Sequence, residues 1–360
     1  MEKKKLCLVI PTLQAGGMER VMSELAWYFS GKNQLETHMV LYGRNPEVFY
    51  KIPGNIMIHK PLSGFNNNLR FISTLGRLWY LRKKVKEINP ATVLSFGEFW
   101  NSFVMIALMG LSYPVYISDR CSPERYYSRV HRVLRRFLYP RAAGIIAQTS
   151  KAKEIYAARF RHDNIKVIGN PIREIKDDKE SSKEDVVLMV GRLIKSKHQD
   201  ELIELFLKIN IPGWKLVLVG YDHLQQNNSE RLLEIIRKNN AQDKVLLEGK
   251  QSDVDRYYRK SRIFAFTSSS EGFPNAIGEA MSAGLPVVAF DCIAGPSEMI
   301  TDQKNGFLVP VFDFEHFRTK LEILMKDRGL QKKMGDQAKK DISKFYIHHI
   351  GEEFYSFLVT

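Results

Sequence analysis

Short apolar runs alternate with amphipathic segments along the whole chain, and this alternation constrains the fold more than any other feature. Between the runs, the spacing of apolar residues is typical of helices. Near-continuous apolar strands separated by helices indicate a parallel sheet that is covered on both faces. We therefore predict an α/β protein with strands in the apolar runs 5–12, 38–43, 92–96, 115–119, 144–150, 186–192, 215–220, 244–249, 263–268, 286–290 and 306–310.

The alternation stops once and then restarts. Residues 173–184 are polar and charged, so we predict a linker there. A length of 360 residues also suits two domains. We predict two facing Rossmann-like domains with parallel sheets, at 1–172 and 185–343, and a last helix at about 344–360 that packs back on the first domain. Ligands bind beyond the carboxyl ends of such strands, so the interdomain cleft is the expected active site.

Positive charge is concentrated in the first half of the chain. Residues 1–170 hold 26 Lys and Arg against 11 Asp and Glu, whereas the remainder holds 28 against 29. Such asymmetry indicates a polyanionic partner: nucleic acid, an anionic membrane surface or a phosphate-bearing substrate. Residues 77–88 and 125–141 read as basic, aromatic membrane-surface helices, or alternatively as ordinary helices with solvated basic faces. No nucleic-acid-binding module is recognisable, so we expect no nucleic-acid partner.

The cysteines and the apolar stretches favour a cytoplasmic protein. Cys7, Cys121 and Cys292 are far apart, which argues against a disulfide framework or a zinc site. The apolar run 6–10 is too short for a signal peptide and reads better as a first strand. The longest apolar stretch, 103–111, is too short to span a bilayer and is predicted to be a buried helix.

Two strand ends carry residues suited to phosphate. Gly16 and Gly17 precede a helix, where backbone N–H groups can approach an anion, although a plain tight turn is an equal alternative. The lack of a third glycine counts against a dinucleotide cofactor. Arg192 and Lys197 follow the first strand of the second domain and suit a diphosphate, the alternative being two solvated cations.

Glu271 and Glu279 flank a predicted helix start at Asn275. We expect Glu271 in the loop and Glu279 about two turns inside the helix, so that the two acids border a helix end that favours anions. Two carboxylates so placed can each accept hydrogen bonds from hydroxyl groups of one phosphate-linked ligand. The alternative is a capping acid plus an exposed helix acid.

Two signals of metal binding are discounted. The D-x-D at 253–255 precedes a helical pattern, where Ser252 or Asp253 reads as an N-cap and Asp255 as a first-turn acid. The histidines show no H-x-x-x-H spacing, and His348 and His349 are adjacent. We therefore predict no metal site.

The segment EGFPNAIGE (271–279) resembles the E-x7-E motif of retaining GT-B glycosyltransferases, family 4 in particular. GRLIKSK (191–197) resembles the diphosphate-binding segment of that family, and the glycine pair resembles its glycine-rich loop. DCIAGPSEMI (291–300) and NGFLVP (305–310) follow in the family's order. The resemblance implies a nucleotide-sugar donor in the C-terminal domain and an acceptor in the N-terminal domain.

The resemblance also implies roles for single residues. Glu279 would hold the ribose hydroxyls, Glu271 the donor sugar, and Arg192 with Lys197 the diphosphate leaving group. Fixed cations then do the work of a divalent metal ion, so no cofactor is expected. Arg120 stands where relatives have a histidine, and would bind the donor sugar or an acceptor phosphate. The other expected donor contacts are Gly16, Gly17, Gly272, Phe273, Asn275, Ala276 and Ile277.

The resulting hypothesis is a retaining transferase that moves a hexose or N-acetylhexosamine from a UDP-sugar to a polyprenyl-diphosphate-linked saccharide. It would build a bacterial surface glycan, such as the O-antigen of lipopolysaccharide, at the inner face of the cytoplasmic membrane. The alternatives are a UDP-sugar epimerase, a glycoside hydrolase using both glutamates, and a basic protein that binds membranes or nucleic acid.

Overall fold

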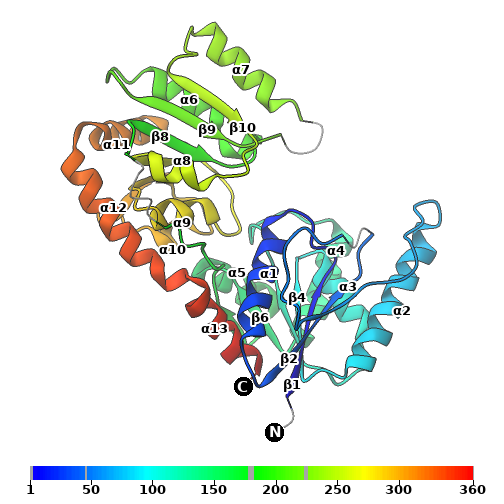
Figure 1. The fold of residues 1–360 in the computed structure, drawn as a ribbon. Coiled ribbons are helices and arrows are strands. Elements are labelled where there is room, and N and C mark those ends of the chain that lie inside the picture. The colour runs from blue at the N-terminus through cyan, green and yellow to red at the C-terminus, as the bar shows by residue number, and fades with distance from the viewer. Residues whose placement is uncertain (1–2, 45–46, 177–181, 223–225, 360) are drawn as a thin grey trace. The chain divides into compact units, whose positions relative to one another are not determined.

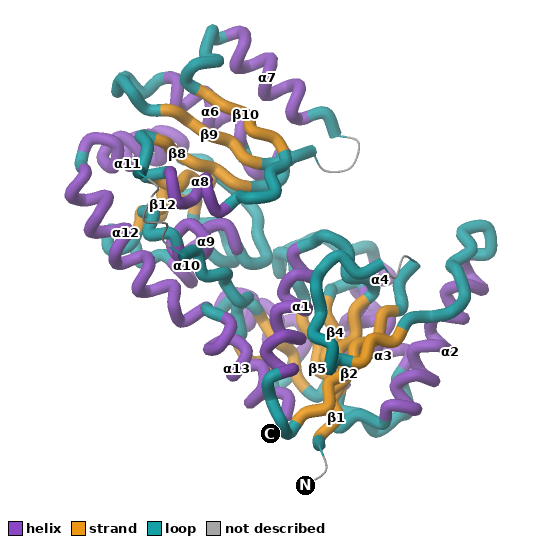
Figure 2. The backbone as a smooth tube through the Cα atoms, in the orientation of Figure 1, coloured by secondary structure: helices purple, strands orange, loops and turns teal. Residues whose placement is uncertain are grey.

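The computed structural model describes residues 3–44, 47–176, 182–222 and 226–359. The chain forms two compact units (Figure 1): unit 1 comprises Met1–Pro171 and Ile347–Thr360, and unit 2 comprises Ile172–Tyr346. In each unit helices pack against a parallel sheet (Figure 2), so the predicted α/β class with two Rossmann-like domains is confirmed.

Unit 1 contains a seven-stranded sheet with the order β3-β2-β1-β4-β5-β6-β7. All of its paired strands are parallel. Because β1 lies between β2 and β4, the winding reverses direction at β1, and ligands bind at such a switch point. The elements are β1 (Lys4–Ile10), α1 (Gly17–Ser30), β2 (Leu35–Leu41), β3 (Met57–His59), α2 (Arg70–Ile88), β4 (Thr92–Phe96), α3 (Trp100–Ala107), β5 (Val115–Ser118), α4 (Arg129–Leu138), β6 (Gly144–Ala147), α5 (Ser150–Phe160), β7 (Ile165–Val167) and α13 (Ile347–Val359).

Unit 2 contains a six-stranded sheet with the order β10-β9-β8-β11-β12-β13. Its paired strands are also parallel, and its switch point lies at β8, between β9 and β11. The elements are β8 (Val186–Val190), α6 (Gln199–Leu207), β9 (Lys215–Val219), α7 (Asn228–Lys238), β10 (Val245–Gly249), α8 (Asp255–Lys260), β11 (Ile263–Phe266), α9 (Asn275–Ser282), β12 (Val287–Phe290), α10 (Pro296–Met299), β13 (Gly306–Val309), α11 (Phe314–Lys326) and α12 (Arg328–Ile342).

The apolar runs are buried because helices cover both faces of the sheets. In β1, residues 6–10 are each at most 1% exposed. The stretch 103–111 is less buried than predicted: α3 ends at Ala107, and Ile106 and Met109 are exposed. Among the described residues, no helix is both long and apolar enough to cross a membrane.

The predicted linker is anchored where the structure describes it. Ile175 is buried, and its N–H donates to Ser282 Oγ at 2.9 Å. Glu184 forms an ion pair with Lys260 at 3.0 Å. Residues 177–181 lie outside the described part of the chain. Apolar side chains on either side of Arg173 therefore tie the start of this segment to unit 2, because Ile172 is buried as well.

The C-terminal helix α13 belongs to unit 1, although unit 2 precedes it in the chain (Figure 1). Phe354 is fully buried, with its ring 6.1 Å from that of Phe96. At Gly351 the helix passes so close to α1 that a Cβ atom would lie 2.4 Å from the ring of Tyr28. An ion pair of 2.6 Å between Lys32 and Glu352 adds a polar contact.

Replacing Phe354 by alanine removes a large side chain from this interface. We expect the Phe354→Ala variant to lose about 3–5 kcal/mol of unfolding free energy, because the cavity is only partly refilled. The exposed His349, on the same helix, provides the control, and His349→Ala should change stability by less than about 0.5 kcal/mol. Urea unfolding followed by circular dichroism measures both, and equal stabilities would contradict the packing of α13 on unit 1.

Candidate functional site

Two loops meet at the carboxyl ends of β8 and β11 in unit 2. The two strands pair in parallel, so the loops that follow them leave the sheet side by side. The loop after β8 contains a short 3-10 turn, Lys195–Lys197, before α6 begins. This location is the switch point of the sheet, where ligands are expected.

Hydrogen bonds join the two loops into one structure. Thr267 Oγ1 donates to the backbone oxygen of Lys197 at 2.7 Å, and the N–H of Ser269 donates to that of Ser196 at 2.9 Å. A ring nitrogen of His198 lies 3.0 Å from Ser269 Oγ. The backbone that carries Lys197 is therefore held in place by the loop that leads to Glu271.

Lys197 and Glu271 form an ion pair between Nζ and Oε1. Their side chains are only 14% and 15% exposed. The ammonium also lies 4.9 Å from the centre of the Phe266 ring. A largely desolvated ion pair is costly to break by removing one partner. The contact thus combines a donor for phosphate oxygens with an acceptor for hydroxyl groups.

Cys292 lies near this pair but is not suited to nucleophilic chemistry. Burial, together with the Glu271 carboxylate, raises the pKa of its thiol to about 12. The thiol therefore stays protonated at neutral pH, and only the thiolate is a strong nucleophile.

Helix α9 starts next to the loop that carries Glu271. Its N-cap residue, Pro274, makes no side-chain capping hydrogen bond, and the N–H groups of Asn275 and Ile277 donate to the backbone oxygens of Phe273 and Pro274, both at 3.0 Å. The following loop presses against this point: Gly295 has φ +136°, and a Cβ there would lie 2.2 Å from Pro274 Cδ. Any residue larger than glycine at position 295 would displace the helix start.

Glu279 is the fifth residue of α9, so it lies just over one turn inside the helix and not two turns as expected. A helical turn takes about 3.6 residues, and Glu279 comes only four residues after the first residue of α9. Glu279 Oε2 accepts a hydrogen bond from Tyr258 at 3.1 Å and lies 4.0 Å from Arg173 Nη2. The same guanidinium bonds Asp255 at 2.6 Å. These partners fix the carboxylate of Glu279 at the helix.

The remaining predicted donor contacts of unit 2 lie around α9 or at the end of β8. Phe273 is buried against Phe345, and Ile277 is in the core with its N–H donating to the backbone oxygen of Pro274 at 3.0 Å. Arg192 is exposed just beyond β8. Gly272, Asn275 and Ala276 are partly exposed.

The D-x-D segment is occupied by contacts within the protein. Asp255 begins α8 and pairs with Arg173, while Asp253 Oδ1 accepts a hydrogen bond from the N–H of Arg256 at 3.3 Å. The N-cap itself is Val254, not Ser252 or Asp253 as expected. Asp253 lies one residue earlier and still reaches a first-turn N–H.

In unit 1 the glycine pair opens α1. Gly17 is the first helical residue, and Gly16 exchanges two hydrogen bonds with the hydroxyl of Tyr50, at 3.2 and 2.9 Å. Tyr50 therefore holds the loop after β1 in place, at the switch point of this sheet. Tyr50 was not predicted, because nothing local in the sequence links it to residues 34 positions earlier.

Asp119 and Arg120 follow β5 but belong to different networks. Asp119 is buried, pairs with Arg135, and accepts hydrogen bonds from Tyr139 at 2.7 Å and Asn101 at 3.1 Å. These three partners satisfy its charge, which identifies Asp119 as a structural anchor for α4.

The guanidinium of Arg120 stacks on the ring of Phe96 at 3.5 Å, and its Nη1 donates to Asn170 at 2.6 Å. Its Nε and Nη2 atoms are buried and have no hydrogen-bond partner among the described residues. Burial lowers the pKa of this guanidinium below its usual value. A buried cation with unused donors is suited to an anionic or hydroxyl-bearing ligand group.

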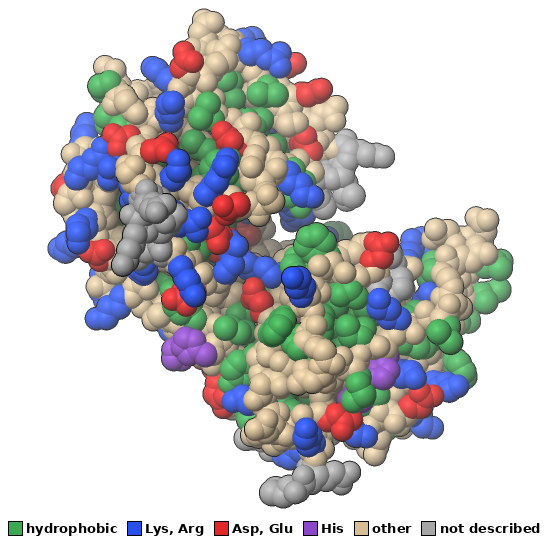
Figure 3. All heavy atoms as spheres, viewed as in Figure 1, with side chains coloured by type: hydrophobic (Ala, Val, Ile, Leu, Met, Phe, Trp, Pro, Cys, Tyr) green, Lys and Arg blue, Asp and Glu red, His purple; other side chains and the backbone are tan. Residues whose placement is uncertain are grey.

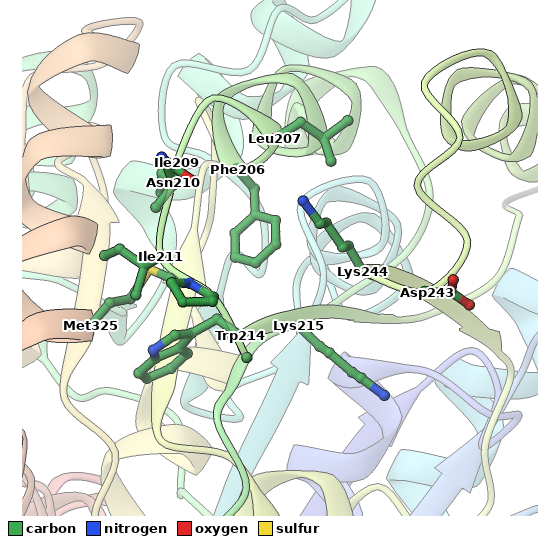
Figure 4. A pocket seen from close by; sticks show the side chains of 12 residues that line it. Phe206, Leu207, Ile209, Asn210, Ile211, Trp214, Lys215, Asp243, Lys244 and Met325 are labelled. Carbon is green, nitrogen blue, oxygen red and sulfur yellow. The ribbon is translucent and has the colours of Figure 1, made fainter.

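A separate pocket of about 300 Å³ lies elsewhere in unit 2 (Figure 4). Its walls include Phe206, Trp214 and Met325, with Lys215 and Lys244 beside them. Lys215 is the first residue of β9, so the pocket is at the amino ends of the strands. It is therefore distinct from the site at the carboxyl ends.

Two residues next to Glu279, Arg173 and Tyr258, were missed by sequence reasoning. Arg173 lay in the predicted linker, and Tyr258 in a segment read only as a helix. The signal for Arg173 was weak: a basic residue directly after Asn-Pro-Ile, at the boundary between the two repeats of the strand–helix pattern.

Comparison with known proteins agrees with this geometry. The profile described as "Glycosyltransferase Family 4" matches residues 15–174, and "Glycosyl transferases group 1" matches residues 171–341. The chain is 28% identical to the amylovoran biosynthesis glycosyltransferase AmsD of Erwinia amylovora, covering 93% of both chains.

Two further relatives extend the comparison. The chain is 26% identical to an alpha-1,4-N-acetyl-D-galactosaminyltransferase of Campylobacter jejuni, with coverage of 97% and 96%; the name of that enzyme includes a diNAcBac-PP-undecaprenol saccharide. The crystal structure of HepE from Anabaena in complex with UDP superposes with a TM-score of 0.82 at 19% identity, covering 98% of both chains, which supports the fold. With both family profiles matched in order and the GT-B fold shared, the chain belongs to the family 4 glycosyltransferases.

Proposed function

We propose that this protein is a retaining, metal-independent glycosyltransferase that uses a UDP-sugar, transferring a hexose or N-acetylhexosamine. The observation that carries the proposal is the contact between Lys197 and Glu271 at the switch point of unit 2. One side chain suits a diphosphate and the other a sugar hydroxyl, and a nucleotide-sugar presents these two groups next to each other.

In the proposed reaction an acceptor hydroxyl attacks the anomeric carbon from the face that the diphosphate leaves. The bond between the anomeric carbon and the diphosphate oxygen breaks, and its electron pair goes to the diphosphate. The hydroxyl proton passes to that leaving group. Lys197 and Arg192 stabilise the developing negative charge, while Glu271 orients the sugar through its hydroxyl groups.

The surroundings of Glu279 suit the ribose of the nucleotide. Tyr258 and Arg173 both approach Oε2 and so fix the orientation of the carboxylate. The start of α9 presents the positive end of the helix dipole, which favours phosphate oxygens. UDP is the proposed donor nucleotide because HepE, which shares the fold, was crystallised with it.

We propose a polyprenyl-diphosphate-linked saccharide as the acceptor, in the assembly of a bacterial surface glycan such as an O-antigen. The name of the Campylobacter relative includes an undecaprenol-diphosphate-linked saccharide, and the Erwinia relative is named for amylovoran biosynthesis. The unpaired nitrogens of Arg120 suit an anionic acceptor group. Sugar transfer to such a membrane-anchored acceptor would place the protein peripherally on the inner face of the cytoplasmic membrane.

Neutralising Lys197 tests the proposed diphosphate site. We expect Lys197→Met, and likewise Glu271→Ala, to lower kcat by roughly 10²–10³-fold, since each removes a group that acts on the transition state. Lys195→Met is the matched control, because Lys195 is an exposed lysine in the same turn and should leave the rate unchanged. Transfer is measured with radiolabelled UDP-sugar. A wild-type rate in Glu271→Ala would refute the assignment.

Ligand-dependent melting tests the donor nucleotide. UDP at 100 times its Kd should stabilise the folded protein by about 2.7 kcal/mol, because it binds only the native state. GDP should give a smaller shift, and Glu279→Ala should reduce the shift with UDP. The exposed Glu234, on α7 of the same unit, provides the control variant Glu234→Ala. A larger shift with GDP would overturn the choice of base.

Chelation tests metal independence. If Arg192 and Lys197 neutralise the diphosphate, transfer should continue at its normal rate in excess EDTA, and added Mn²⁺ should not stimulate it. The measurement is the initial rate of transfer with protein dialysed against EDTA. Activity that disappears with EDTA and returns with Mn²⁺ would show that the cations are insufficient.

A further inference from the structure

Exposed apolar side chains are concentrated on one layer of unit 1. In the part of the chain that the structure describes, 21 large hydrophobic residues are exposed, of which 16 belong to unit 1 and 5 to unit 2. Thirteen of the 16 lie on α2, α3 and α4 or in the segments beside them. Helix α3 packs against α2 on one side and α4 on the other, so the three helices form one layer (Figure 1). Single exposed apolar residues are ordinary, whereas such a concentration marks an interaction surface.

The segment 62–79, a loop and the first half of α2, is the densest part of this layer. Hydrophobic side chains are visible over α2 at the right of Figure 3. Residues 72, 75 and 79 are three and four positions apart and so share one face of the helix. Six large side chains of this segment are between 49% and 106% exposed: Leu62, Leu69, Phe71, Ile72, Leu75 and Trp79.

Helix α4 repeats this arrangement. Val130, Val133 and Phe137 are 68%, 48% and 62% exposed and have the same spacing of three and four residues. An exposed arginine directly precedes each of them, at positions 129, 132 and 136. The helix thus presents an apolar row with arginines along its edge. The buried side of α4 is anchored by the ion pair of Arg135 with Asp119, so the outward arginines are not needed for that contact.

The charges of the layer have almost one sign. Residues 48–86 contain eight Lys and Arg and no Asp or Glu, and residues 125–141 contain six Arg and no acid. Residues 99–118, which include α3, carry no charged side chain. A partner that fits must offer negative charge and an apolar phase in the same plane. The surface of an anionic phospholipid bilayer offers both.

We propose that residues 62–79 and 126–137, here called the docking face, bind an anionic phospholipid bilayer. Phe71, Trp79 and Phe137 enter the boundary of the acyl chains, and the arginines of α4 contact lipid phosphates. Helices α2 and α4 both start at the carboxyl edge of the unit 1 sheet, because each follows a parallel strand of it. The inference rests on the proposed function insofar as a membrane-anchored acceptor explains why the face exists.

Vesicle co-sedimentation tests the docking face without any sugar transfer. The probes are vesicles of phosphatidylethanolamine with phosphatidylglycerol, and vesicles of phosphatidylcholine alone. The native protein should bind the first and not the second. Phe71→Ser/Trp79→Ser should bind roughly tenfold more weakly or worse, because apolar burial is lost while the charge is unchanged. Arg129→Gln/Arg132→Gln/Arg136→Gln should lose binding on the order of 100-fold at low salt.

Leu233→Ser/Ile323→Ser is the matched control. Leu233 and Ile323 are exposed apolar residues, 38% and 39%, on helices of unit 2, and their loss should not affect vesicle binding. Circular dichroism and melting should be unchanged in every variant, since all of the substituted side chains are exposed. Transfer to a short-chain, water-dispersed acceptor should also remain normal in the docking-face variants.

Three results would overturn the docking face, and a fourth would refute only the proposed function. No binding of the native protein to anionic vesicles would overturn the inference, and so would native-like binding by Phe71→Ser/Trp79→Ser. Binding to duplex DNA that is tighter than binding to vesicles, and indifferent to Phe71 and Trp79, would also overturn it. Normal vesicle binding without any sugar transfer would instead refute the proposed function and leave the docking face intact.

Discussion

Parallel pairing of the first strand of each unit with neighbours on both sides is the constraint on which the rest depends. In unit 2, β8 lies between β9 and β11, so the loops after β8 and β11 emerge side by side. Parallel strands need crossover helices, and these helices bury both faces of the sheet. The loops that follow the strands gather at the carboxyl edge, and it is there that Lys197 and Glu271 meet.

The Lys197–Glu271 pair also explains how the site stays ready for a ligand. Two mostly buried charges neutralise each other, so neither is left desolvated and unpaired. A diphosphate entering the site would bring its own negative charge to the ammonium, and the carboxylate could then accept from hydroxyl groups. The hydrogen bonds between the two loops keep this geometry without a ligand, which lowers the cost of ordering on binding.

The two units differ in net charge and in the number of apolar side chains that they expose. Unit 2 is almost neutral and carries the proposed nucleotide-sugar site, whereas unit 1 is basic and holds most of the exposed large apolar side chains among the described residues. The difference in charge follows from composition, but its effect on binding depends on where the basic side chains lie. Basic side chains scattered over a surface would only keep a protein in solution, while those beside the apolar rows of α2 and α4 make a surface that favours anionic lipid.

Much of the fold and part of the site were accessible from the sequence. The period of apolar residues determined the strands, helices and parallel sheets, and the order of motifs pointed to Arg192, Lys197, Glu271 and Glu279. The inference about the fold holds because it depends on local patterns, whereas the roles of those four residues stay predictions. The predicted burial of 103–111 and the two-turn depth of Glu279 were wrong, because exposure depends on neighbouring helices and depth on where α9 begins.

By itself, the sequence determined the strand–helix alternation, the repetition of the α/β pattern and the excess of positive charge in the first half. Only the tertiary structure decided that Lys197 contacts Glu271 across 74 residues, that Arg173 reaches Glu279, and that residues 62–79 face outward. The physical reason is that such contacts depend on which strands become neighbours and how each helix is rotated on the sheet. Those are properties of the packed chain and not of any short segment.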